Sequence, residues 1–175
     1  MAVITVFGSS RPAPGTPEYE IARELGAALA RAEFTVCTGG YGGVMEGVSR
    51  GAREAGGHTI GVTAEVFRSA ANAWVVEEVR VKTWQERLFE LIRRGAGYVV
   101  LPGGTGTFAE LAVVWEMLNK SFLQRKPLIV LGDFWWPVLD LVEKKENPNY
   151  LVLRAATPSE AVGLLTRHPG KPERD

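Results

Sequence analysis

The chain has 175 residues, of which 46% are hydrophobic, and its twenty basic residues balance twenty acidic ones. This length fits one domain, because a chain of about 150 residues already buries about two-thirds of its unfolded surface. The balanced charge provides no long-range field for a nucleic-acid backbone or an anionic membrane, so we expect neither partner and look for a local anion site.

Short apolar runs alternate along the chain with segments of helical period. The expected strands span residues 3–7, 34–38, 59–62, 74–81, 98–101, 128–131 and 150–153. The expected helices span residues 17–30, 43–55, 84–95, 108–123, 135–145 and 158–166, and Thr16 and Thr157 precede prolines as predicted N-caps. This alternation predicts a Rossmann-like, doubly wound α/β fold with a mainly parallel sheet of about seven strands and helices on both faces. We expect one nucleotide-binding domain over 1–168 and a flexible tail over 169–175.

The N-terminal segment and the cysteine content predict a cytoplasmic protein. Residues 1–7 lead into a glycine turn without the basic region or cleavage site of a secretory signal. No apolar run approaches the roughly 20 residues that cross a bilayer. The single cysteine, Cys37, lies in an apolar run and has no partner for an internal disulfide, which favours a structural thiol in a reducing compartment.

Three turns that follow expected strands carry the residues of a candidate binding site: Gly8-Ser9-Ser10-Arg11, Gly39-Gly40-Tyr41-Gly42-Gly43 and Pro102-Gly103-Gly104-Thr105-Gly106-Thr107. Ligands of open parallel sheets bind beyond the carboxyl ends of the strands, so these turns are expected to meet at one edge. Glycines allow the backbone to approach a ligand, and the amides of a helix start attract a phosphate. Tight packing between strand and helix is the alternative explanation for such glycines. Neither glycine-rich turn matches a Walker loop or G-x-G-x-x-G, which disfavours intact ATP or NAD.

Two charged residues have competing explanations at this stage. Glu110 lies one turn inside the helix that follows the third turn, where its carboxylate could face a sugar attached to the phosphate. The segment from Thr107 to Glu110 also matches a capping box, a pattern that recurs from Thr83 and from Thr157. Arg87, on the preceding helix, is more simply explained as a solvated side chain. His58 and His168 have no partners at ligand spacing, so we predict no metal site.

The motifs at 102–110 and 39–46 resemble those of the Lonely Guy family of cytokinin riboside 5′-monophosphate phosphoribohydrolases, long labelled lysine decarboxylases. The family motif P-G-G-x-G-T-x-x-E is complete here, and V-F-x-G-S-S is approximated by residues 6–10. Residues 38–45 resemble the glycine-rich turn of the family, and residues 56–62 resemble its next strand. The resemblance covers most of the chain, and the order and spacing of the motifs agree.

The resemblance implies an enzyme that hydrolyses the N-glycosidic bond of a nucleoside 5′-monophosphate, without a cofactor, as a homodimer or higher homo-oligomer. The implied catalytic residues are Arg87, fifteen residues before the motif proline, and Glu110. Substrate and phosphate binding is then assigned to Gly8, Ser9, Ser10, Gly39, Gly40, Gly42, Gly43, Met45, Gly103, Gly104, Thr105, Gly106 and Thr107. Helix 108–123, with Trp115, Met117 and Leu118, is expected to supply either a self-association surface or core packing.

A non-catalytic protein that binds or carries a phosphorylated ligand is the alternative function. Some relatives resemble molybdenum-cofactor carriers. The active cytokinin enzymes of the family usually have a lysine after the catalytic arginine, whereas Leu88 stands there in this chain. Lysine decarboxylation would need pyridoxal phosphate on a lysine, and Lys82, Lys120 and Lys126 lie in no supporting motif, so this activity is not expected.

Overall fold

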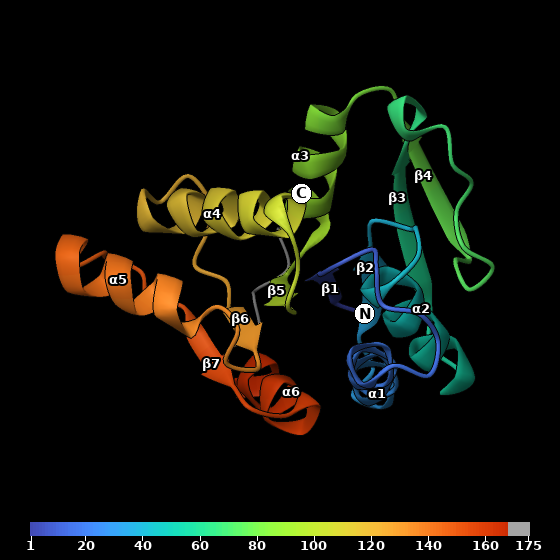
Figure 1. Ribbon diagram of the computed structural model, residues 1–175, viewed down its shortest axis with the longest axis horizontal. Helices are drawn as coiled ribbons and strands as arrows, with labels where there is room; N and C mark the ends of the chain where they lie inside the picture. The colour runs from blue at the N-terminus through green and yellow to red at the C-terminus, as the bar shows by residue number, and fades with distance from the viewer. Residues whose placement is uncertain (168–175) are drawn as a thin grey trace.

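The computed structural model describes residues 1–167 around a seven-stranded parallel sheet (Figure 1). The strands are β1 (Val3–Phe7), β2 (Thr35–Thr38), β3 (Thr59–Ala64), β4 (Glu77–Val81), β5 (Gly97–Val100), β6 (Leu128–Leu131) and β7 (Leu153–Ala155). The helices are α1 (Pro17–Arg31), α2 (Val44–Glu54), the 3₁₀ turn η1 (Glu65–Phe67), α3 (Trp84–Arg94), α4 (Thr105–Asn119), α5 (Trp136–Glu146) and α6 (Pro158–Arg167). The predicted α/β fold is confirmed. His168 and the predicted tail at 169–175 lie outside the described residues.

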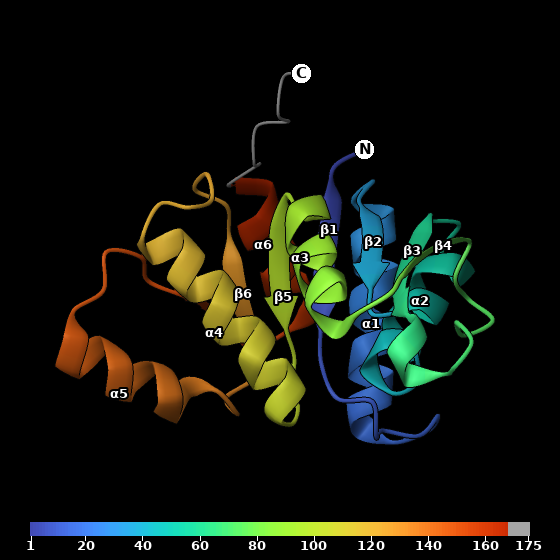
Figure 2. The ribbon, with the colours of Figure 1, turned by 90° about the horizontal axis from the view of Figure 1, so that it is seen from above.

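Helices cover both faces of the sheet, and each layer buries its own apolar cluster. α3, α4 and α5 pack on one face, against strand side chains such as Phe7 and Tyr98. α1, α2 and α6 pack on the other face, against the alternate side chains of the same strands, such as Val6 and Val99. Successive strand residues point to opposite faces, so a strand covered on both sides is apolar throughout. Figure 1 shows α3 and α4 above the strands and α1 and α6 below them, and Figure 2 shows the same elements from above. No helix within 1–167 is long and apolar enough to cross a membrane.

The order of the strands places a crevice at the centre of the sheet. The strands lie in the order β4-β3-β2-β1-β5-β6-β7, so the chain moves outward from β1 to β4 and then crosses to β5 on the other side of β1. Phe7 at the end of β1 lies beside Val100 at the end of β5. Ligands of doubly wound sheets bind at such a switch point, beyond the carboxyl ends of the two strands.

The last predicted strand was placed too early in the chain. Residues 150–153 were expected to form it, but β7 begins only at Leu153. The Tyr150 hydroxyl donates to the Lys126 carbonyl at 2.7 Å and accepts from the Leu128 amide at 2.8 Å, while the Tyr150 carbonyl accepts from the Trp115 indole at 2.9 Å. Tyr150 is therefore buried as a polar anchor of the segment before β6, an arrangement that an apolar run cannot distinguish from a strand.

The predicted side-chain cap forms at two of the four helix starts. The Thr83 hydroxyl accepts from the Glu86 amide at 3.1 Å within a complete capping box, and the Thr157 hydroxyl accepts from the Glu160 amide at 3.2 Å. Thr16 is the N-cap of α1 ahead of Pro17, as predicted, but its hydroxyl donates to the Ala13 carbonyl and does not cap the helix. The capping-box pattern from Thr107 to Glu110 also fails: α4 begins at Thr105, after Gly104 as N-cap, and ends at Asn119 rather than 123.

Candidate functional site

The three turns predicted from the sequence open into one cavity of about 1470 Å³ at the switch point. Most of the predicted site residues line it: Gly8, Ser9, Ser10, Gly39, Gly42, Met45, Arg87, Gly103, Gly104, Thr105, Gly106, Thr107 and Glu110. Gly40 and Gly43 do not. Gly43 has a φ of 68°, and a side chain there would overlap the backbone of Ser9 and Ser10, so close packing of the turns explains this glycine.

The start of α4 carries hydrogen-bond donors that the helix does not use. Its first hydrogen bond runs from the Phe108 amide to the Gly104 carbonyl at 2.9 Å, so the amides of Thr105, Gly106 and Thr107 precede the intrahelical ladder. Thr107 is only 4% exposed, yet its hydroxyl makes no hydrogen bond within residues 1–167. These donors, with the partial positive charge of the helix end, form an anion-binding arrangement.

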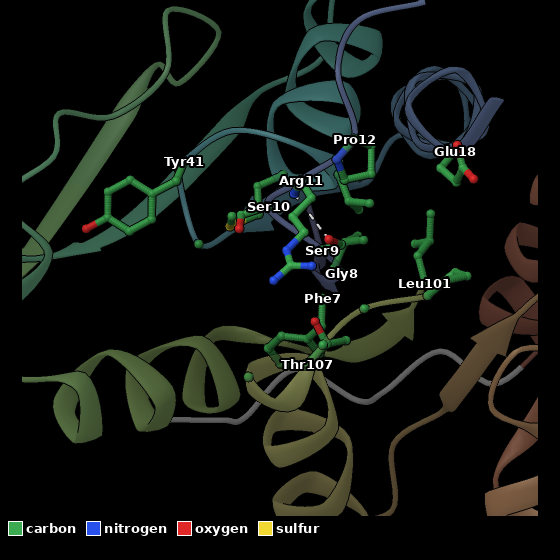
Figure 3. A pocket seen from close by; sticks show the side chains of 18 of the residues that line it. Phe7, Gly8, Ser9, Ser10, Arg11, Pro12, Glu18, Tyr41, Leu101 and Thr107 are labelled. Atoms are coloured by element: carbon green, nitrogen blue, oxygen red, sulfur yellow. Dashed lines mark hydrogen bonds between the residues drawn. The ribbon is translucent and has the colours of Figure 1, made fainter. Parts of the chain in front are cut away.

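The serine turn faces this helix start across the cavity (Figure 3). The Ser9 hydroxyl oxygen accepts a hydrogen bond from the Arg11 amide at 3.1 Å, which leaves the hydroxyl proton available to a ligand. The Ser9 amide donates to the Pro102 carbonyl at 3.1 Å and thereby joins the serine turn to the third turn. An anion at α4 would therefore meet donors from both turns.

Arg87 is a buried, fully oriented side chain, so its explanation as a solvated arginine was wrong. Its side chain is 8% exposed. Nε donates to the Val62 carbonyl at 2.8 Å and Nη2 to the Gly39 carbonyl at 3.0 Å. The rings of Tyr41 and Phe67 lie 5.3 and 5.6 Å from the guanidinium carbon, within the range of cation–π contact. β3, the glycine-rich turn and η1 together fix its direction.

Glu110 faces Arg87 inside the cavity and does not cap α4. Its Oε1 lies 3.8 Å from Nη1 of Arg87, and its side chain is 12% exposed. Burial raises the pKa of Glu110 to about 7, against the opposing effect of the Arg87 charge, and burial also lowers the pKa of Arg87. A carboxyl group that titrates near neutrality can exchange a proton with a bound molecule at physiological pH.

One wall of the cavity comes from residues that sequence reasoning did not select. Tyr41 and Phe67 pack edge to face, and the Tyr41 hydroxyl accepts from the Ala64 amide at 2.9 Å. The Asn72 side-chain amide donates to the carbonyls of Gly40 and Tyr41 at 3.1 and 2.9 Å, which ties the loop after β3 to the glycine-rich turn. The one available signal for Tyr41 was its place among four glycines.

Several other candidates lie away from the cavity. Leu88 is 4% exposed and packs in the core beneath α3, so its side chain adds nothing to the cavity wall. Lys82, Lys120 and Lys126 also do not line the cavity. Cys37 is fully buried, and burial raises the pKa of its thiol to about 12, in keeping with a structural role.

Helix α4 contributes its large apolar side chains mainly to the core. Trp115 and Leu118 are buried there, and Met117 packs against the same cluster. Phe108, by contrast, is half exposed and stacks on Trp135 with ring centroids 5.7 Å apart. Core packing thus accounts for the three residues expected at a self-association surface, and the homodimer stays a prediction.

Comparisons with known proteins agree with this architecture. The model of the SLOG cluster4 family matches residues 1–162. A cytokinin riboside 5′-monophosphate phosphoribohydrolase of Rhodococcoides fascians is 30% identical over 148 residues, which cover 80% of this chain and 73% of that protein. A protein of the same name from Mycobacterium marinum is 40% identical over 124 residues, 66% of each chain.

Solved structures give a second comparison. A molybdenum cofactor binding protein from Rippkaea orientalis is similar with a TM-score of 0.76 at 26% identity, over 95% of this chain and 96% of that one. The molybdenum cofactor carrier protein of Chlamydomonas reinhardtii shares the fold, with a TM-score of 0.73 at 24% identity over the same fractions. With the family model matching nearly the whole described chain, the protein belongs to the SLOG cluster4 family, and the resemblance to the Lonely Guy family is confirmed.

Proposed function

We propose that the chain hydrolyses the N-glycosidic bond of a nucleoside 5′-monophosphate, AMP or a cytokinin-type nucleotide, to a free base and ribose 5-phosphate. The observation that carries this proposal is the Arg87–Glu110 pair, which is buried in the same cavity as the unused donors of α4. The helix start would hold the phosphate and leave the sugar facing the carboxylate one turn away. Phosphate binding and bond cleavage would then use one continuous site.

The proposed reaction needs stabilisation of positive charge on the sugar and activation of water. Cleavage of an N-glycosidic bond proceeds through an oxocarbenium-like transition state, which a nearby carboxylate stabilises. Glu110 would also accept a proton from the attacking water, whose oxygen bonds to C1′ of the ribose while the bond between C1′ and the base nitrogen breaks. The proton that Glu110 takes from the water then passes to the departing base nitrogen, so the base leaves neutral and Glu110 is again a carboxylate. Arg87 would orient Glu110 and stabilise negative charge that develops on the base.

Relatives support the same chemistry. The proteins from Rhodococcoides fascians and Mycobacterium marinum carry the name of this activity, at 30% and 40% identity. The motif from Pro102 to Glu110 supplies the helix start and the carboxylate in this chain.

The direct test is incubation of the purified chain with AMP and with other monophosphates, including cytokinin ones, followed by chromatography for base and ribose 5-phosphate. Glu110→Gln should lower kcat/KM by about 100- to 10,000-fold, the usual effect of losing a general base. Glu116→Gln, which alters an exposed carboxylate of the same helix, serves as the matched control. Undiminished product from Glu110→Gln would remove the proposed role of this residue.

A carrier of a phosphorylated ligand is the second candidate function, and the cavity size favours it. Typical ligand pockets measure about 300–1000 Å³, whereas this cavity reaches about 1470 Å³. The similar structure from Rippkaea orientalis is named a molybdenum cofactor binding protein. Native mass spectrometry of freshly isolated protein discriminates the two candidates. A retained phosphorylated ligand without AMP hydrolysis favours the carrier, and turnover of AMP by ligand-free protein argues against it.

A further inference from the structure

Three successive carbonyl groups of the glycine-rich turn accept hydrogen bonds from two side chains. The Gly39 carbonyl accepts from Nη2 of Arg87 at 3.0 Å. The carbonyls of Gly40 and Tyr41 accept from the Asn72 side-chain amide at 3.1 and 2.9 Å. The Asn72 backbone amide also donates to the Gly40 carbonyl, at 2.8 Å. Adjacent peptide planes share one Cα atom, so the direction of the Gly39 carbonyl depends on how Asn72 holds the next two.

The side chain of Asn72 is committed to the backbone although the residue lines the cavity. Its Nδ2 donates to two carbonyls, and its Oδ1 accepts from the Trp74 amide at 3.0 Å. An asparagine amide has two N–H donors, so both are in use. A reversed amide would direct its oxygen at two carbonyl oxygens, which makes the observed orientation the favourable one. Asn72 therefore acts on the cavity through its neighbours and not through contact with a ligand.

Asn72 joins the two segments whose aromatic rings cover Arg87. Tyr41 belongs to the glycine-rich turn, whereas Phe67 belongs to the segment after β3 that leads to Asn72. The two rings pack edge to face, 5.7 Å apart, and lie 5.3 and 5.6 Å from the guanidinium carbon. If the two segments separated, the rings and the carbonyl acceptor that restrain the guanidinium would separate with them.

The remaining contact of the guanidinium lies on the sheet. Nε donates to the Val62 carbonyl of β3 at 2.8 Å. This bond holds one edge of the planar guanidinium, and the Gly39 carbonyl holds another, so that Nη1 lies 3.8 Å from Oε1 of Glu110. A guanidinium released at the Gly39 carbonyl would pivot about the Val62 contact and carry Nη1 away from Glu110.

We infer that Asn72 is a positioning residue that fixes the glycine-rich turn and, through this turn, the guanidinium of Arg87 in the orientation that faces Glu110. The inference rests on the proposed function, in which Arg87 orients Glu110. Displacement of a catalytic group by about 1 Å costs about 100-fold in rate. Loss of the Asn72 side chain should therefore impair the reaction step. It should leave phosphate binding unchanged, because none of the side-chain hydrogen bonds of Asn72 involves α4.

The first test needs no substrate and measures hydrogen exchange of the Arg87 Nε proton by NMR of the full chain labelled with nitrogen-15. Arg87→Lys identifies the signal by its loss. Asn72→Ala should accelerate this exchange about tenfold, because a guanidinium that pivots opens to water more often. Asn72→Ser is a second variant: a serine hydroxyl can keep the local bond to the Trp74 amide but is too short to span both carbonyls, so exchange should again be faster.

The second test is steady-state kinetics with AMP. Asn72→Ala should lower kcat about 10- to 100-fold and change KM less than about twofold, which separates positioning of Arg87 from damage to the phosphate site. Asn119→Ala is the matched control and should alter neither measurement. Its Oδ1 also ties down a distant segment, accepting from the Asn149 amide at 2.8 Å, but it lies outside the cavity.

The two tests separate the inference from the proposed function. Unchanged exchange of the Arg87 proton in both Asn72 variants overturns the inference, whatever the turnover. Faster exchange with an unchanged kcat also overturns it, because the orientation of Arg87 would then not matter to the reaction. Faster exchange in a chain that does not hydrolyse AMP at all refutes the hydrolase proposal, while the placement of Arg87 by Asn72 stands.

Discussion

Replacing Glu110 by glutamine should change how the stability of the protein depends on pH. Burial raises the pKa of this carboxyl group from 4.5 to about 7. Between these values the unfolded chain has lost the proton and the folded chain retains it, so folding becomes less favourable as pH rises. The contribution to stability is fully present below pH 4.5 and is lost as pH rises through about 7.

The magnitude follows from the same two pKa values. Linkage gives a loss of about 2.5 kcal/mol in the free energy of unfolding between pH 5 and pH 8 from this one group. The side chain is 12% exposed, so solvent screening leaves most of this effect in place. Glutamine has no charge to gain, and Arg87 keeps its two carbonyl acceptors in the variant. The pH-dependent part should disappear, whatever constant change the substitution adds.

Urea unfolding followed by tryptophan fluorescence at pH 5 and pH 8 measures this difference. The free energy of unfolding of Glu110→Gln, relative to the unmodified chain, should rise by about 2.5 kcal/mol between the two pH values. Glu116→Gln on the same helix should give no such change. Parallel pH profiles for the unmodified chain and Glu110→Gln would refute the reasoning, because they would mean that the carboxylate is ionised at little cost in the folded state.

Three further substitutions test the supports of the site. Gly103→Ala places a methyl group against the Thr107 hydroxyl and should raise the KM for AMP about tenfold in steady-state kinetics. Gly104→Ala is the control and should leave the KM unchanged, because a methyl group there meets open space. The methyl group of Gly39→Ala overlaps the Arg87 guanidinium, so kcat should fall about 100-fold while the circular dichroism spectrum stays native. An unchanged kcat would contradict the role of the Arg87 position. Thr83→Ala removes a capping hydrogen bond of 3.1 Å and should lower the free energy of unfolding in urea by about 1 kcal/mol. An unchanged free energy of unfolding would mean that packing alone holds α3.

The sequence was sufficient for the fold and the location of the cavity, because both follow from periodicity and chain order. Buried parallel strands must be apolar, so their runs stand out against helical segments, and six of the seven strands lie where the runs predict them. The turns after β1, β2 and β5 must share one edge once the sheet is parallel. Ser9, Gly39 and Thr105 therefore meet in one cavity although they are distant in the chain.

Side-chain roles were harder to predict, because they depend on partners from distant elements. Nothing near Arg87 in the chain indicates that the carbonyls of Val62 and Gly39 receive its guanidinium. Glu110 matched a capping box equally well until the helix start was fixed at Thr105, three residues earlier than the pattern requires.

The buried pair also bears on the choice between hydrolase and carrier. A carboxyl group in this cavity costs folding free energy when it ionises, and a negative charge there repels a phosphorylated ligand. Glycosidic hydrolysis, unlike ligand storage, requires a group that takes a proton from water near pH 7. Leu88 does not weaken this argument, because its side chain lies in the core and does not line the cavity. The proton chemistry of Glu110 therefore favours turnover. This reasoning requires that Glu110→Gln binds AMP more tightly than the unmodified chain and releases less base.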